Sequence, residues 1–305
     1  MKKQKMRIAG PLLIISAAVI WGLSFVIQSE GTKYIGTFTF CTVRCILAAL
    51  FLLPINLVRA KVSPALKQSF HDKKQRKDII LGSVCVGTML CIGINFQQYA
   101  FEFTAPGKVG FITALYMLLV PIFSVFLKMK PPITVWLGVI VGLAGLYLLC
   151  VGFTTSFGAI GKGEIVALIG AVAFALHIMV IDRFARRVDN TVLSCGQFIV
   201  AGAISAVFML IFEQPNIHNI LNASLPLLYT GILSSGVAFT FQIIGQKYTE
   251  PTVASLFLCL ESVFSVFFSF VILHTQMSFS EYLGCGIMFV GIVIAQIRPK
   301  KLLRR

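Results

Sequence analysis

Ten apolar runs, each long enough to cross a bilayer, constrain the fold of this 305-residue chain more than any other feature. A helical span needs roughly 20 apolar residues at a rise of about 1.5 Å per residue. The runs predict spans at residues 11–29, 35–57, 79–100, 106–127, 133–152, 163–182, 191–212, 224–245, 252–273 and 280–297. The first run has no clear cleavage site, so it is expected to be a span rather than a signal peptide. The predicted fold class is therefore an all-α integral membrane protein with ten transmembrane helices.

The composition indicates that lipid, not water, surrounds these helices. Charged residues make up only 12% of the chain, whereas soluble domains carry about 25%. The formal net charge of +15 does not indicate nucleic-acid binding, because the basic residues lie in short runs between the apolar stretches. We therefore expect the lipid bilayer as a partner, and no nucleic acid.

The basic residues fall on one side of the membrane when the ten spans are drawn. That side receives 22 of the 26 Lys and Arg residues, from the N-terminus, the segment 58–78, the short connections and the C-terminal tail. The other side receives Lys33, Lys108 and Lys162, and Arg44 lies within a span. The positive-inside rule then places both termini in the cytoplasm, as an even number of spans requires. The polar segment 58–78 is expected to be a cytoplasmic loop whose basic residues contact anionic headgroups.

The two halves of the chain resemble each other. At an offset of 153 residues, Gly10 matches Gly163, Trp21 matches Phe174 and Arg44 matches Gln197. Further along the chain, Phe96-Gln97 matches Phe241-Gln242 at an offset of 145, and Ile122–Phe126 matches Val263–Phe267 at 141. Leu137-Gly138 matches Leu283-Gly284 at 146. Chance similarity among apolar helices is the alternative, but the order of the matches favours duplication. Each copy holds five spans, an odd number, so the second copy enters the membrane from the opposite side. This predicts two inverted five-helix repeats, residues 1–157 and 158–305, an architecture common among transporters.

Several short motifs carry a family resemblance. They are the run Ala18–Phe25, Arg44, Pro121, Leu260-Glu261, and Glu281 followed by Gly284, Gly286 and Gly291. In these residues, and as two five-helix units over essentially the whole length, the chain resembles the EamA family of the drug/metabolite transporter superfamily. One position departs from the family pattern: Ser262 stands where a proline usually follows the glutamate, so the helix break expected there lacks its usual cause.

The resemblance implies transport without naming a substrate. Members of the family export or exchange amino acids, sugars, nucleotide-related metabolites and drugs. It also implies a central cavity lined by spans 1–4 and 6–9, with spans 5 and 10 peripheral, and a bacterial inner membrane as the location. We therefore expect a secondary transporter of a small metabolite such as an amino acid, acting as an exporter or exchanger by alternating access.

Charged residues inside the spans are the strongest pointers to a site. A charge at the bilayer centre costs roughly 2.5–3.5 kcal/mol on insertion scales. Arg44 and Glu261 each lie about ten residues into a predicted span, near the midplane. One hypothesis directs both into a polar cavity, Arg44 toward a substrate carboxylate or phosphate and Glu261 toward an ammonium group or a proton. The other hypothesis makes them a structural ion pair between the halves.

Polar and aromatic residues on shared helix faces complete the candidate substrate-binding set. Residues three or four apart share a face of a helix. The set comprises Trp21, Ser24 and Gln28 in span 1, Asn95 and Gln98 in span 3, Tyr116, His177, Gln197, and Gln242 in span 8. Gln97 and Tyr229 are further lining candidates. Each amide could instead be a hydrogen bond between helices, and His177 could be a proton carrier or a neutral structural residue.

Other functional classes find less support in the sequence. The eight cysteines lie in apolar segments without a CxxC, so neither a metal, a cofactor nor a disulfide is expected. The sequence has no GxxxxGK[ST], HExxH or GxSxG motif, which argues against nucleotide hydrolysis and against an enzyme. An intramembrane enzyme, a channel and a flippase for lipid-linked substrates remain the alternatives. Glycines in spans 5 and 10 predict close helix packing, within a monomer or at a homodimer contact.

Overall fold

The computed structural model describes residues 2–104, 106–151, 161–273 and 276–297, and the elements assigned within them are helices. The first half contains α1 (Lys2–Gly31), α2 (Thr37–Val62), α3 (Pro64–His71), α4 (Lys73–Ala100), α5 (Pro106–Ala114), α6 (Tyr116–Phe126) and α7 (Ile133–Cys150). The second half contains α8 (Lys162–Phe184), α9 (Asn190–Phe212), α10 (Ile217–Asn222), α11 (Ser224–Leu228), the π-helix η1 (Tyr229–Phe239), α12 (Thr240–Gln246), α13 (Pro251–Leu258), α14 (Leu260–Leu273) and α15 (Phe279–Gln296). The predicted boundary at 157/158 and the basic tail 298–305 lie outside the described residues.

Ten helical segments are long and apolar enough to cross a membrane, which confirms the predicted number and order of spans. Most of their ends lie within three residues of the prediction. Outward-facing positions carry large apolar side chains, among them Leu50, Ile140 and Val293, each at least 60% exposed. Such a surface is stable only when lipid covers it.

The polar segment 58–78 is largely helical, so the prediction of a loop was wrong. Span 2 continues to Val62 and span 3 already begins at Lys73. Between them, the Ser63 side chain accepts a hydrogen bond from the first turn of α3, and Asp72 accepts one from Gln75 N at 2.7 Å in α4. These two N-caps satisfy amide groups that would otherwise lack partners, and so they start a new helix after each short break. Hydropathy detects only the apolar part of such a helix.

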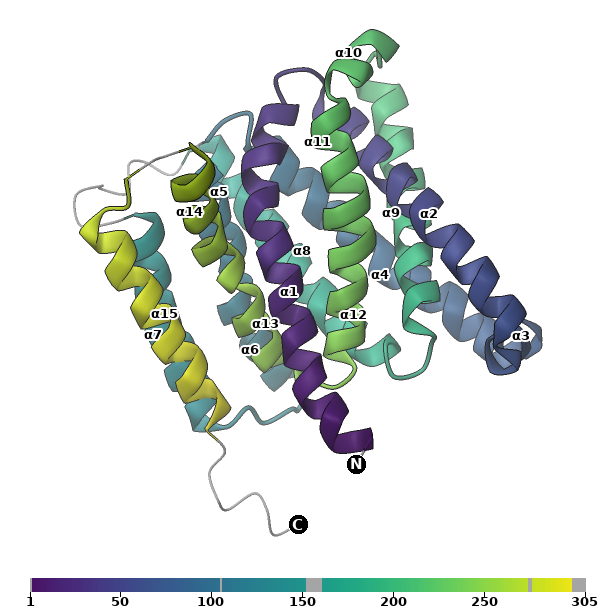
Figure 1. The fold of residues 1–305 in the computed structure, drawn as a ribbon, viewed down its shortest axis with the longest axis horizontal. Helices are drawn as coiled ribbons and strands as arrows, with labels where there is room; N and C mark the ends of the chain where they lie inside the picture. Colours follow the sequence, from purple (N-terminus) through teal and green to yellow (C-terminus); the bar gives the residue numbers. More distant parts are fainter. Residues whose placement is uncertain (1, 105, 152–160, 274–275, 298–305) are drawn as a thin grey trace.

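The two halves are interleaved rather than placed side by side. Helix α4 packs against α8 and α9, α2 packs against α9 and η1, and α1 packs against α14, η1 and α12. The start of α1 and the end of α15 lie at the same end of the bundle, near which α3 also lies (Figure 1). We call this end the basic end and the other the opposite end. Because five spans separate the start of one half from the start of the next, the halves run in opposite directions.

Helices α7 and α15 form a separate pair at one edge of the bundle (Figure 1). A Cβ atom added to Gly138 would lie 2.6 Å from Gly291 O, and one added to Gly145 would lie 2.8 Å from Gly284 O. The backbones can approach this closely only because these positions lack side chains. The glycines predicted to support close packing therefore pair spans 5 and 10 within one chain.

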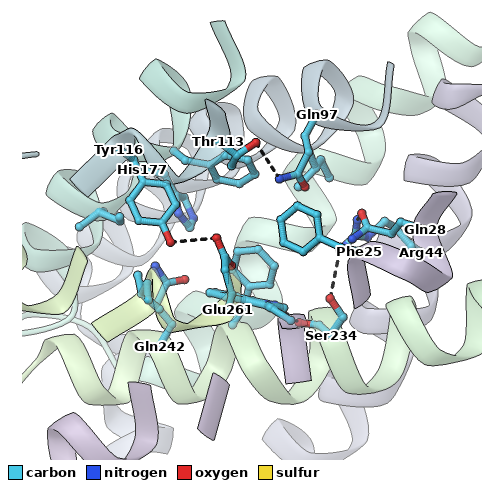
Figure 2. Close-up of a pocket in the computed structure, with 16 residues that line it drawn as sticks. Phe25, Gln28, Arg44, Gln97, Thr113, Tyr116, His177, Ser234, Gln242 and Glu261 are labelled. Atoms are coloured by element: carbon cyan, nitrogen blue, oxygen red, sulfur yellow. Dashed lines mark hydrogen bonds between the residues drawn. The ribbon is translucent and has the colours of Figure 1, made fainter. Parts of the chain in front are cut away.

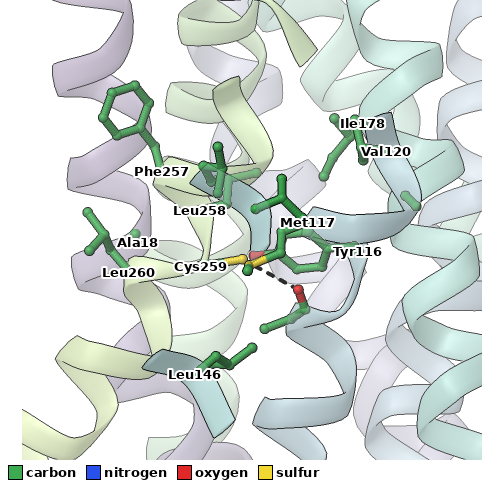
Figure 3. Packing of buried hydrophobic residues seen from close by; sticks show 14 of the residues in the cluster. Ala18, Tyr116, Met117, Val120, Leu146, Ile178, Phe257, Leu258, Cys259 and Leu260 are labelled. Carbon is green, nitrogen blue, oxygen red and sulfur yellow. Dashed lines mark hydrogen bonds between the residues drawn. The ribbon is translucent and has the colours of Figure 1, made fainter. Parts of the chain in front are cut away.

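Two spans are interrupted where they pass through the centre of the bundle. Span 4 is broken at Leu115, between α5 and α6, and span 9 is broken at Cys259, between α13 and α14. The breaks touch, since Cys259 Sγ lies 3.4 Å from Ala114 O (Figure 3). The break in span 9 thus forms without a proline at Ser262, and the break in span 4 lies six residues before Pro121, which α6 contains.

Candidate functional site

The residues that follow the two helix breaks meet at the interface between the halves. Tyr116 begins α6 and Glu261 is the second residue of α14. The Tyr116 hydroxyl donates a hydrogen bond to Glu261 Oε1 at 2.9 Å, and the glutamate is only 5% exposed. An interrupted helix brings polar groups to the middle of a bundle, which is a recurrent feature of transporter sites.

Arg44 of α2 is also buried, at 2% exposure, and its donors point to uncharged acceptors. Nη1 donates to Gln28 Oε1 at 2.8 Å, and Nε donates to Ser235 Oγ at 3.2 Å. Nη2 lies 3.5 Å from Ser234 Oγ. Both serines belong to the π-helix η1, and such helices occur frequently at functional sites.

Arg44 and Glu261 do not pair with each other. Within the described part of the chain, the ion pairs are Lys33–Glu30, Arg59–Asp189, Lys108–Glu164 and Arg186–Asp182. A buried charge without an opposite charge is costly, and it is usually retained for a functional reason. The arrangement therefore argues against the second of the two hypotheses, in which these residues form a structural ion pair between the halves.

A cavity of about 50 Å³ separates the two charges. Figure 2 shows Tyr116, His177, Gln242 and Glu261 at one end, Gln28, Arg44 and Ser234 at the other, and the Phe25 ring between them. The aromatic residues Trp21, Phe25, Phe174 and Phe239 supply much of the wall, with the rings of Trp21 and Phe239 4.6 Å apart. The site thus combines an apolar middle with a cation at one end and an acidic group at the other.

Seven of the eleven residues predicted to bind substrate line this cavity: Trp21, Gln28, Arg44, Tyr116, His177, Gln242 and Glu261. The other four lie behind its wall. Ser24 Oγ donates to Ser234 Oγ at 3.1 Å, and Gln98 Nε2 donates to Gln28 O at 3.3 Å. Gln197 contacts His177, and Asn95 donates to Ser205 Oγ at 2.7 Å. These four support residues that line the cavity or join neighbouring helices.

The remaining lining residues are Phe25, Ile94, Gln97, Thr113, Phe174, Ile178, Ser234, Phe239 and Leu258. Only Gln97 was among the further candidates from the sequence, and Tyr229 instead donates to Ile20 O at 2.8 Å. The internal repeat could have identified one more of them. Phe174 occupies the position in the second half that matches Trp21, so a candidate set extended to matching positions would have included it.

The lining residues come from spans 1–4, 6, 8 and 9. This agrees with the expectation that spans 5 and 10 are peripheral, while span 7 contributes no lining residue in the described part of the chain. Over the same residues, no group of three or more His, Cys, Asp or Glu side chains is placed to hold a metal ion.

Both ends of α2, the helix that carries Arg44, are held by α9 of the other half. At the opposite end of the bundle, the Glu213 carboxylate accepts hydrogen bonds from Phe38 N at 2.8 Å and Thr39 N at 2.7 Å. At the basic end, Arg59 binds Asp189 at 2.8 and 2.9 Å. Burial raises the pKa of Asp189, but hydrogen bonds from Arg59 and Thr191 outweigh it, so the pKa lies below its usual value.

Comparisons with known proteins agree with this architecture. The model of the EamA-like transporter family matches twice, over residues 8–151 and 161–296. A solved crystal structure superposes with a TM-score of 0.77 over 96% of this chain and 98% of its own, at 20% identity, which supports the fold alone.

Relatives at the sequence level are transporters. A transporter of Archaeoglobus fulgidus is 27% identical over 96% of this chain and 87% of its own length. The Bacillus subtilis transporter YoaV is 26% identical over 92% of this chain and 94% of its own. The aromatic amino acid exporter YddG of Ancylobacter novellus is 25% identical over 69% of this chain and 75% of its own.

The two family matches cover most of the chain, one in each five-helix half, and both halves contribute residues to the cavity that holds Arg44 and Glu261. The protein is a multi-pass membrane transporter rather than an enzyme, and it belongs to the EamA-like transporter family.

Proposed function

We propose that this protein is a secondary transporter that exports or exchanges an amino acid or a related small metabolite by alternating access. The observation that carries the proposal is the cavity between the halves, in which Arg44 and Glu261 are both buried without an ionic partner among the described residues. A guanidinium group binds carboxylates well, because its donors match the two carboxylate oxygens. The aromatic wall suits an apolar side chain, and the relation to an aromatic amino acid exporter supports the same class.

Transport of such a solute requires the cavity to widen. A volume of about 50 Å³ holds a few water molecules, at roughly 10–15 Å³ each, and is too small for an amino acid. The contacts of α9 with both ends of α2 are candidates for the bonds that break in turn as the two halves rock. We also propose that each repeat, 1–157 and 158–305, acts as one moving unit, with both termini on the cytoplasmic side of the inner membrane.

Flux measurements in proteoliposomes test the proposal. A panel of labelled amino acids and related solutes is offered to the wild type and to Glu261→Gln, with and without a pH gradient. We expect flux of at least one amino acid in the wild type and its loss in the variant. Accumulation of a solute driven by the pH gradient would show that its transport is coupled to protons. Flux of no panel member through folded wild-type protein would contradict the proposal.

A further inference from the structure

His177 has one ring nitrogen whose role is fixed by its neighbour. His177 and Gln197 are both fully buried, and His177 Nε2 lies 3.0 Å from Gln197 Oε1. An amide oxygen can only accept a hydrogen bond, so Nε2 of the neutral ring carries the hydrogen. Nδ1 therefore carries a lone pair. It is buried and has no hydrogen-bond partner among the described residues.

Gln242 presents a second acceptor of the same kind. Its side chain is 2% exposed, it lines the cavity, and Oε1 is buried without a partner in the described part of the protein. Figure 2 places Gln242 and His177 beside Glu261, whose carboxylate accepts a hydrogen bond from Tyr116. One end of the cavity therefore gathers three acceptor side chains.

Buried acceptors without donors are rare in folded proteins, because each gives up its hydrogen bonds to water. A primary ammonium group has three N–H donors, no acceptor and a positive charge. It would supply one donor to each of the three acceptors and neutralise the carboxylate. A hydroxyl group has only one donor and would leave two acceptors unpaired.

We propose that His177 Nδ1, Gln242 Oε1 and Glu261 form a subsite for a primary ammonium group, with Gln197 as the residue that sets the His177 tautomer. The inference rests on the proposed function and deepens it, because it names the group bound at the end of the cavity away from Arg44. An α-amino acid would then lie with its carboxylate toward Arg44 and its ammonium toward this subsite. The α-carbon would then lie between the two ends, so the Phe25 ring that lies there would move aside when the ligand binds.

Ligand binding can be followed by the fluorescence of Trp21, which lines the cavity. The chain has two tryptophans, and the other, Trp136, is replaced in a Trp136→Phe background. The probes are L-phenylalanine, 3-phenylpropionate, which lacks the ammonium group, and phenethylamine, which lacks the carboxylate. We expect the parent protein to bind L-phenylalanine at least about tenfold more tightly than 3-phenylpropionate.

Substitutions at Gln242 test the subsite directly. Gln242→Leu is expected to weaken L-phenylalanine and phenethylamine about tenfold while leaving 3-phenylpropionate unchanged. Gln242→Glu keeps an acceptor and adds charge, so it should retain the preference for the amines. His177→Leu should resemble Gln242→Leu, and circular dichroism and thermal unfolding report whether each variant folds.

Three results would overturn the subsite. The first is that Gln242→Leu weakens the binding of all three probes equally. The second is that neither amine binds to the parent protein. The third is that sodium, but not potassium, changes the fluorescence of the parent and that Gln242→Leu abolishes this response. The last result would assign the acceptors to an inorganic cation. Failure of the proposed function looks different, because phenethylamine would still bind and depend on Gln242 while no amino acid crosses the membrane.

Discussion

The charged residues of the cavity are matched by different side chains in the other half, whereas glycines of the peripheral helices are matched by glycines. Arg44 matches Gln197, and Tyr116 matches Glu261 at an offset of 145. The only arginine at the cavity therefore comes from the first half and the only carboxylate from the second, within the described residues.

The peripheral helices show the contrary pattern. Gly138 of α7 matches Gly284 of α15, and Gly145 matches Gly291. All four are close to the backbone of the partner helix. The inverted scaffold needs symmetry, because each half is the packing partner of the other. The site needs asymmetry, because a ligand with unlike ends cannot fit two identical ends.

The largest effect is expected when the asymmetry of charge is removed. Arg44→Gln gives the first half the residue that the second has at the matching position. Losing a hydrogen bond from a charged donor costs about 1.5–3 kcal/mol, so flux of L-phenylalanine in proteoliposomes should fall about 10- to 100-fold. Lys61→Gln, an exposed position in the same helix and outside the cavity, is the matched control and should keep most of the flux. Equal flux in the two variants would show that Arg44 is not part of the substrate site.

The double charge swap Arg44→Glu/Glu261→Arg tests whether the two charges act on each other or on a ligand. Because each residue has its own uncharged partners, the swap is expected to leave flux as low as in the single variants. A structural ion pair would instead be restored by the exchange. Flux and thermal unfolding of the two single variants and the double variant, measured together, decide between these outcomes.

The sequence predicted the fold better than it predicted the site. Apolar length alone determines which segments cross the membrane, so ten spans followed directly from it. Which face of a span points to the cavity is harder to infer from the sequence when the whole helix is apolar. Asn95 and Gln98 were placed in the site on the basis of polarity, yet they face other helices, where buried amides find hydrogen-bond partners.

The aromatic wall could not be separated from ordinary core residues by sequence pattern. Phe25 and Phe239 resemble the many other phenylalanines of the chain, and they meet in the cavity wall because helices distant in sequence pack together there. Neither the break at Leu115 nor the break at Cys259 coincides with a proline, which is the residue that usually signals a helix break. Long-range packing, rather than local propensity, sets this part of the structure.

A smaller effect, on stability alone, is expected where the halves are alike. A Cβ atom added to Gly291 would lie 2.7 Å from Gly138 O and from Gly142 N, whereas Gly286 in the same helix has nothing within 4 Å. Overpacking costs typically 1–3 kcal/mol, so Gly291→Ala should lower the unfolding temperature in detergent by several degrees. Gly286→Ala should leave it unchanged or raise it slightly, because alanine favours the helix. Equal unfolding temperatures for both variants would show that the α7–α15 contact tolerates a side chain.

The smallest effect is expected at the basic end of the α2–α9 pair, where the halves differ in how their helices begin. Asp189 caps its own helix by accepting from Thr191 N at 3.1 Å, whereas the start of α2 takes its cap from Glu213 of the other half. Asn can still cap a helix, so Asp189→Asn removes mainly the ion pair with Arg59.

An ion pair at a partly exposed site contributes about 0.2–1 kcal/mol, so Asp189→Asn should lower the unfolding temperature by about one to three degrees at pH 7. The folded-state pKa of Asp189 is lowered, so its stabilisation is fully present above the unfolded value of about 3.9 and is lost as the pH falls through the folded value. Unfolding curves of wild type and variant should therefore converge below about pH 4. A gap that persists unchanged at pH 3 would mean that the cap, rather than the charge, is the stabilising contribution of Asp189.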